Sequence, residues 1–274
     1  QGCLSVFGDR TTPPLQSGLT GRVQLGRTEE VVAFYRQTRI DNPDSVQALS
    51  ALADALIAAG RPDEALAAYD EFLARRPDDI GGLMAKADTL RSLNQLEDAV
   101  LVYQRAIRLA PTQPQPLIER AGVLASLGRE DEALATYQRA IDLIENGSEE
   151  QADIGPRGSL YLAYTGMARL FLSQGRIEDA ATLVQTILEA RPDVAQVHIL
   201  AGDLARTQGQ RVQALTAFRD ALALAPANAL ANVRVGDLLL EADRLGEARD
   251  AYETALGSEP GYLPATLGLS LIHI

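Results

Sequence analysis

The chain has 274 residues, 46% of them hydrophobic, and a formal net charge of −12 at pH 7. The acidic balance argues against a nucleic-acid partner, because binding phosphates requires a basic surface. No apolar run reaches the ~18–20 residues of a membrane-spanning helix. The only cysteine is Cys3, which excludes an internal disulfide and a cysteine-based metal site.

Residues 1–26 are expected to form a flexible N-terminal segment or a degenerate helix, because Gly18 and Gly21 interrupt any apolar periodicity. Cys3 follows Gly2, as the lipid-bearing cysteine follows a small residue in bacterial lipoproteins. Lipidation of Cys3 and an incidental thiol are both open, and a membrane partner is expected only if Cys3 is lipidated. Residues 27–45 are expected to form a partial repeat consisting of one helix before Pro43.

Residues 46–147 are predicted to contain three repeats of two helices each. In the first repeat, Leu49, Leu52 and Leu56 mark one apolar helical face. Gly60 can then take the left-handed conformation that ends a helix, and a second helix begins near Pro62. Asp78 is expected to cap the helix that follows.

The helices recur with a period of about 34 residues, which prolines mark. Residues 148–160 form an acidic, turn-rich loop, which is either a surface insertion or a lip that contacts a partner. Residues 161–262 then contain three more repeats, and residues 263–274 begin a truncated repeat with a doubtful tail. The prolines that end the second helices are Pro43, Pro77, Pro111, Pro192, Pro226 and Pro260.

A helix–turn–helix repeat of this length buries its apolar face only against a neighbouring repeat. The fold class predicted is therefore all-α: a right-handed α-solenoid, or superhelix, of stacked helix–turn–helix repeats of about 34 residues. Small residues are expected where the two helices of a repeat cross, with aromatic residues filling the space beside them. Tyr69, Tyr103, Tyr137 and Tyr252 are accordingly expected in the core.

This pattern resembles the tetratricopeptide repeat family over residues 46–262, in six copies, and we expect a bacterial protein. The first copy shows the family signature at Ala53, Ala65, Tyr69 and Pro77, but carries Phe72 where a small residue is usual. The resemblance implies a concave groove lined by the first helix of each repeat, in which an extended peptide is bound. The candidate groove residues are Gln47, Asp54, Met84, Asp88, Arg91, Gln115, Ile118, Arg169, Gln196, Ile199, Asp203, Arg206, Val233 and Asp237.

Four aspartates among these candidates favour neutral or basic partners. Members of the family that bind chaperone tails use Asn and Lys on this face. Aspartate stands at the matching places here and the lysines are missing, so that activity is not expected.

No catalytic motif is present, and His198 occupies a core position of its helix, so neither an enzyme nor a cofactor or metal is expected. The predicted function is a non-catalytic scaffold that binds a peptide or protein segment in the groove. The alternatives are an envelope lipoprotein that aids assembly or secretion, and the interaction arm of a larger enzyme or sensor. The compartment is open between the cytoplasm, which is favoured, and the cell envelope.

Overall fold

The computed structural model describes residues 25–146 and 158–272, and in this part of the chain it contains fourteen helices and no strand. The predicted all-α fold class is therefore confirmed. The chain divides into two compact units, Gln1–Leu93 and Asn94–Ile274, here called the N-terminal and C-terminal units. The division falls within the predicted block 46–147, and each unit is described by itself. The predicted segment 1–26 and Cys3 lie outside the described residues, except for the start of the first helix.

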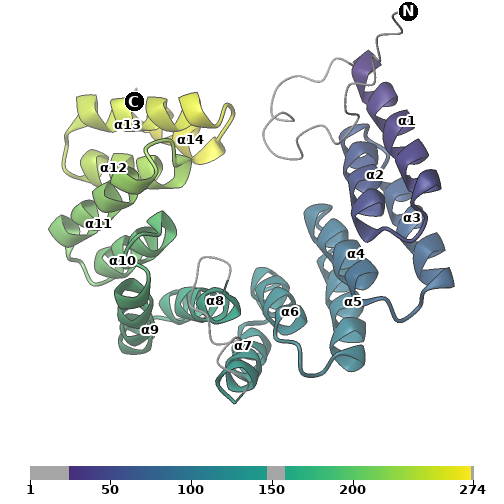
Figure 1. The fold of residues 1–274 in the computed structure, drawn as a ribbon. Helices are drawn as coiled ribbons and strands as arrows, with labels where there is room; N and C mark the ends of the chain where they lie inside the picture. Colours follow the sequence, from purple (N-terminus) through teal and green to yellow (C-terminus); the bar gives the residue numbers. More distant parts are fainter. Residues whose placement is uncertain (1–24, 147–157, 273–274) are drawn as a thin grey trace, which may run out of the picture. The chain divides into compact units, whose positions relative to one another are not determined.

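The N-terminal unit is a stack of four helices (Figure 1). Each packs against the next in the chain, and the second also packs against the fourth. The first of them covers most of residues 27–45, the segment in which one helix was expected. These helices are α1 (Leu25–Asp41), α2 (Val46–Ala58), α3 (Pro62–Arg75) and α4 (Ile80–Ser92).

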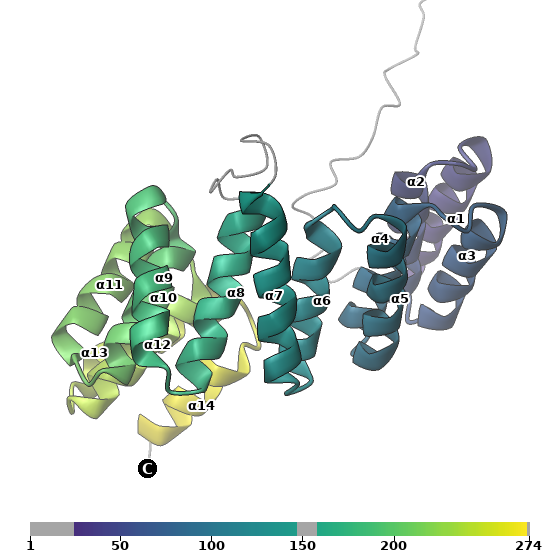
Figure 2. The same ribbon diagram turned by 90° about the horizontal axis from the view of Figure 1, so that it is seen from below.

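The C-terminal unit continues the same pattern over ten helices, seen from a second direction in Figure 2. Successive helices pack against each other, and α6 also contacts α8, α8 contacts α10, and α12 contacts α14. Helix α8 begins within the predicted loop 148–160, and residues 147–157 of that loop lie outside the described residues. The helices are α5 (Leu96–Leu109), α6 (Gln115–Ser126), α7 (Glu130–Glu145), α8 (Ser159–Ser173), α9 (Ile177–Ala190), α10 (Ala195–Thr207), α11 (Arg211–Leu224), α12 (Ala229–Glu241), α13 (Leu245–Ser258) and α14 (Leu263–Ile272).

We call the first helix of each repeat an A helix and the second a B helix, so that α2, α4, α6, α8, α10 and α12 are A helices. A residue in the left-handed region follows each of them, at the same position of every repeat. Glycine occupies four of these turns, and Asn94 (φ 60°) and Asp243 (φ 58°) occupy the other two. Asn and Asp tolerate this conformation better than other non-glycine residues because their short polar side chains bond locally. The glycines are Gly60, Gly128, Gly175 and Gly209.

Side-chain caps begin three of the A helices. Ser45 accepts a hydrogen bond from the backbone N–H of Ala48, and Asn228 accepts one from Ala231. At α4 the cap is Asp79, whose Oδ1 lies 2.8 Å from the backbone N of Gly82. The prediction of Asp78 as this cap was therefore wrong by one residue. The side chain that caps must come directly before the helix, so that it can reach the free N–H of the third residue.

Aromatic rings fill the crossings between helices, as predicted. Tyr69, Tyr103 and Tyr252 are at most 1% exposed, and Tyr137 is 5% exposed. Glycines provide the space: a Cβ atom added at Gly202 would lie 2.4 Å from the ring of Phe218. The rings therefore set how closely the helices of a repeat approach.

Two tyrosines are each enclosed by glycines from two different helices. The ring of Tyr252 lies against Gly236 of its own repeat and against Gly268 of α14. The phenol of Tyr137 lies beside Gly122 and against Gly166 of α8. A single ring thus joins one repeat to the next, which is the contact that stacking requires.

Phe72, the exception to the family signature, is also accommodated by a glycine. Its side chain is 1% exposed. A Cβ atom at Gly82 of α4 would approach the Phe72 ring to 2.7 Å, so Gly82 leaves the room that the larger side chain needs. The change at position 72 is matched by a small residue in the following helix.

We expect Gly202→Ala to destabilise the C-terminal unit by about 1–3 kcal/mol, because the new methyl group overlaps the buried Phe218 ring. Chemical denaturation followed by circular dichroism measures this. Gly246→Ala in α13 is the matched control, since a Cβ atom there meets nothing within 4 Å. It should leave stability unchanged or raise it by up to about 1 kcal/mol. Equal losses from both variants would contradict the packing described.

The buried phenol of Tyr137 predicts a loss of stability in alkaline solution. Burial, with a smaller effect of the Glu119 charge, raises the pKa of Tyr137 from 10.0 to about 12. A group whose pKa is raised by folding stabilises the fold below its unfolded pKa and loses that contribution as pH rises through the folded value. The free energy of unfolding should therefore fall between about pH 10 and 12, with Tyr137 contributing up to about 2–3 kcal/mol.

The variant Tyr137→Phe, measured by denaturation at pH 8 and at pH 11.5, isolates this contribution. It should reduce the alkaline loss of stability. An unchanged difference between the two pH values would show that other groups cause it.

Candidate functional site

Three A helices of the C-terminal unit, α8, α10 and α12, share a groove of about 540 Å³. Leu172 of α8 and Leu230 of α12 supply its apolar surface, and the buried Leu200 of α10 lies beneath them. We call it the C-terminal groove. The polar residues that line it are Arg169, Ser173, Gln196, Asp203, Arg206, Thr207 and Arg234.

The structure brings four of the predicted groove residues together here: Arg169, Gln196, Asp203 and Arg206. Arg169 lies on α8 and the other three on α10. Their spacing on α10 follows the helical period, which places side chains three and four residues apart on one face. These four form the candidate site.

Other predicted residues lie elsewhere. Ile118, Ile199 and Val233 are buried, at 5%, 1% and 3% exposure. Naming them as ligand contacts was wrong, because their side chains pack against neighbouring helices and leave almost no surface for a partner. Gln115 on α6 is half-buried, and its amide donates a hydrogen bond to Glu119 at 2.6 Å.

The predicted residues of the N-terminal unit lie on α2 and α4. Gln47, Asp54 and Arg91 are exposed, and Met84 and Asp88 are half-buried. Arg91 Nη2 lies 3.2 Å from Asp88 Oδ1 on the same helix, and partial burial raises the pKa of Asp54.

A hollow of about 340 Å³ in the same unit lies between α1 and the α2–α3 hairpin. Its arginines are paired, Arg36 with Glu64 at 2.8 Å and Arg39 with Glu71 at 3.1 Å. Its charges therefore compensate each other.

Arg234 of α12 is the groove residue that sequence reasoning missed. Its Nε lies 2.9 Å from Asp203 Oδ1, and its Nη1 lies 4.0 Å from Asp237 Oδ2. Asp237 also accepts a hydrogen bond from the Tyr252 hydroxyl at 2.8 Å. With Asp88, which pairs with Arg91, three of the four predicted groove aspartates are thus bound by neighbouring side chains. Asp203 lines the groove and Asp237 does not, and the helical periodicity gave no signal for pairing between helices.

The pKa of the Asp203 carboxyl group is raised above its ordinary value despite its ion pair with Arg234. Burial raises that pKa, and the nearby charges of Arg234, Arg206 and Arg169 only partly oppose the effect. The attraction is therefore smaller than the cost of removing the carboxylate from water. The three arginines nevertheless act together on a negative charge at this position.

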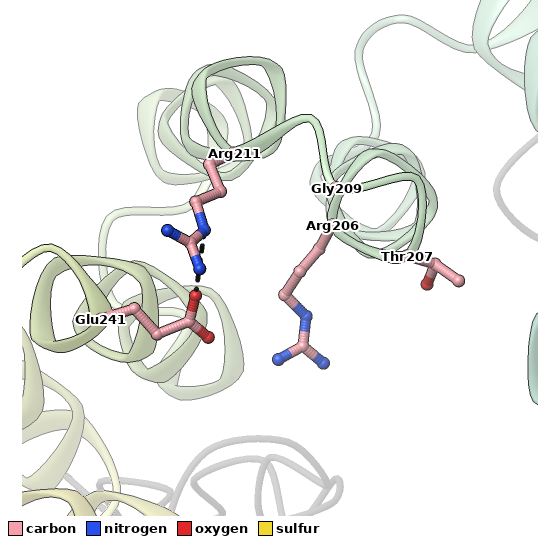
Figure 3. Close-up of a pocket in the computed structure, with 5 residues that line it drawn as sticks. All are labelled: Arg206, Thr207, Gly209, Arg211 and Glu241. Atoms are coloured by element: carbon pink, nitrogen blue, oxygen red, sulfur yellow. Dashed lines mark ion pairs between the residues drawn. The ribbon is translucent and has the colours of Figure 1, made fainter.

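Arg206 also lines a second hollow, of about 350 Å³, beside the groove (Figure 3). Arg211 and Glu241 form an ion pair there, with Arg211 Nε 3.4 Å from Glu241 Oε2. Arg206 extends from α10 toward the same opening. In the described part of the chain, neither Arg206 nor Arg169 forms an ion pair or a hydrogen bond through its side chain.

His198, the one histidine among the described residues, has a structural role. It is half-buried, as predicted, and its Nε2 lies 2.7 Å from the carbonyl oxygen of Pro192. Since a carbonyl only accepts, Nε2 is the donor. Asn232, at the same position of the next repeat, makes the equivalent bond to Pro226 at 3.1 Å. This position therefore ties the start of an A helix to the end of the preceding repeat.

Within the described ranges, no group of three or more His, Cys, Asp or Glu side chains is arranged to hold a metal ion. None of the described helices has the length and apolar character to span a membrane. The groove offers guanidinium groups, an amide and apolar side chains, which suit the binding of a ligand.

Two family models, both described as tetratricopeptide repeat, match this chain. One covers residues 22–88, and the other covers residues 84–148, 165–211 and 199–262. The chain belongs to the tetratricopeptide repeat family. Its fold is that of a protein-interaction scaffold, and the family predicted from the sequence is confirmed. No curated protein matched the sequence.

Solved structures of low sequence identity share the fold. A tetratricopeptide repeat protein from Parabacteroides merdae is 16% identical with a TM-score of 0.72, over 91% of this chain and 93% of that one. The APC/C hetero-tetramer Cut9–Hcn1 is 15% identical with a TM-score of 0.66, and the match covers 90% of this chain but 46% of the matched chain. PilW, a type IV pilus biogenesis factor, is 15% identical with a TM-score of 0.63, and the match covers 82% of this chain and 98% of that one. This tetratricopeptide repeat chain thus spans about half of the matched Cut9–Hcn1 chain and nearly all of the other two.

We expect Asp203→Asn to change the stability of this tetratricopeptide repeat protein by less than about 1 kcal/mol at pH 7. The pKa of Asp203 is raised because burial outweighs the attraction of Arg234, so the charge of Asp203 at pH 7 adds no net stability. Chemical denaturation at pH 7 measures the difference. Gly202→Ala, at the preceding residue, provides the destabilised comparison, and a similar loss from both would assign Asp203 to the packing of the fold.

Proposed function

We propose that this protein binds a peptide or an extended protein segment in the C-terminal groove. The observation that carries the proposal is the groove itself: three successive A helices jointly line about 540 Å³ with two partly exposed leucines and a set of polar side chains. Binding pockets combine these two kinds of surface, since apolar area supplies affinity and a few polar groups fix orientation.

The rigidity of the repeats supports this role. The helices are held by buried rings and small residues beneath the groove, such as Phe218 against Gly202. The receptor surface therefore exists before the ligand arrives, and no binding free energy is used to order it. Truncating an exposed groove side chain, such as Arg169 or Arg206, should change the ligand contacts and leave the packing beneath intact.

An extended segment fits the groove better than a compact small molecule. The lining residues lie on three helices, and packed helices are spaced about 8–10 Å apart. A ligand that contacts all three must therefore extend beyond one helix spacing, and an extended chain covers about 3.3 Å with each residue.

The preference for neutral or basic partners was predicted from four aspartates, and that prediction did not take the charge of Arg234 into account. Cys3 lies outside the described residues, so lipidation and the envelope location remain predictions from the sequence. The protein-interaction scaffold is the common element of these alternatives.

The single cysteine of the chain allows a direct test of the site. On a Cys3→Ser background, Gln196→Cys places a photo-crosslinker in the groove, and Gln213→Cys places the same group on an exposed position of the B helix α11. Peptides selected from a random display library against the unlabelled protein should crosslink at position 196 and not at position 213. Mass spectrometry of the conjugates measures this.

Selected peptides that react equally at both positions would place binding outside the groove. A library that yields no binder would remove the proposal for peptide ligands.

A further inference from the structure

The charges of the C-terminal groove and the hollow beside it do not cancel. Two carboxylates line them, Asp203 and Glu241, and each is paired with an arginine, Arg234 and Arg211. The nearby Asp237 accepts a hydrogen bond from the Tyr252 hydroxyl, and its Oδ2 lies 4.0 Å from Arg234 Nη1. The lining therefore contains more guanidinium groups than carboxylates.

Arg169 and Arg206 are the two arginines that remain. Both are exposed side chains that line the groove, on α8 and α10 respectively. Among the described residues, neither has an ion-pair partner. Each is close enough to Asp203 to lower the pKa of that carboxyl group. A second negative charge placed in the groove would be attracted in the same way.

The spacing of these two arginines suits an extended peptide. Helices α8 and α10 pack against each other, which sets their axes about 8–10 Å apart. Residues i and i+2 of an extended chain lie on the same face, about 6.6 Å apart. Long, flexible arginine side chains can close the remaining difference.

We propose that the C-terminal groove binds an extended acidic segment, with Asp or Glu side chains at positions i and i+2 held by Arg169 and Arg206. This inference rests on the proposed function and specifies its ligand. It reverses the charge preference predicted from the aspartates, because Arg234 neutralises Asp203 while two guanidinium groups stay available. Arginine matches a carboxylate with two parallel N–H donors, which makes the recognition geometric as well as electrostatic.

Side-chain carboxylates are the source we commit to, rather than a free C-terminal carboxylate. A chain end supplies one carboxylate, whereas two separate helices each present an unmatched arginine. The partly exposed leucines of the groove, Leu172 and Leu230, would contact the apolar parts of the segment.

The test uses an array of random ten-residue peptides with amidated C-termini, each printed with Glu, Gln or Lys at positions 4 and 6. The full-length protein should bind the Glu versions best. Moving the second Glu to position 5 should weaken binding, because neighbouring residues of an extended chain point to opposite faces. Fluorescence anisotropy in solution then gives the affinity of the best Glu peptides.

Variants of the protein separate local recognition from bulk charge. Arg169→Gln and Arg206→Gln should each weaken binding of the Glu peptides about fivefold. Arg219→Gln is the matched control, since it removes the same charge from an exposed position of α11 outside the groove. It should leave the affinity unchanged. Asp203→Asn should strengthen binding, because it frees Arg234, whereas a groove that recognises basic segments would be weakened by the same change.

The possible failures are distinguishable. Three results would overturn the acidic-segment proposal while leaving the groove as a peptide site. The protein could prefer the Lys peptides, the Arg219→Gln variant could lose as much affinity for the Glu peptides as the groove variants, or the Asp203→Asn variant could bind the Glu peptides more weakly. Tighter binding of peptides with a free carboxylate end would overturn it in favour of chain-end recognition. Absence of binding by any peptide would overturn the proposed function as well. Thermal denaturation of each variant confirms that it is folded.

Discussion

The close crossing of two helices within each repeat is the constraint on which the rest of the structure depends. At these crossings Ala or Gly faces an aromatic ring, and the ring leaves no room for a further carbon atom, as at Gly202 and Phe218. Where the same ring also touches a glycine of the helix that follows its own repeat, as Tyr252 touches Gly268 of α14, one side chain fixes the geometry within a repeat and beyond it. The surface formed by the A helices follows from these contacts, because their separation is set from beneath.

Most of this architecture could be predicted from the sequence, since it depends on side-chain size at a fixed period. Prolines one repeat apart, small residues at the crossings and left-handed turn residues such as Gly60 are local signals that recur. The errors occurred where a feature of the structure depends on the exact position of one residue, or on a partner that is distant in the sequence. Asp79 rather than Asp78 caps α4, and Gly82 makes the room for Phe72 that its own repeat does not provide.

The candidate site was predicted only in part, for a physical reason. Helical periodicity places a residue on the A-helix face, but it does not separate the edge of that face from its buried centre. Ile199 and Asp203 lie one turn apart on α10, yet Ile199 is 1% exposed while Asp203 lines the groove. The pairing of Asp203 with Arg234 joins the A helices of two successive repeats, and it is a product of the tertiary structure.

That pairing shows why a count of aspartates in a sequence is a poor guide to the charge of a groove. Asp203 carries a carboxylate, but Arg234 balances it, and burial makes its charge costly rather than favourable. The electrostatic character of the surface is then decided by the groups that have no partner, and in this groove those are guanidinium groups. A protein with a net charge of −12 can therefore present a locally cationic site. At physiological ionic strength charges farther apart than about 8 Å are largely screened, so the nearest side chains outweigh the charge of the whole chain.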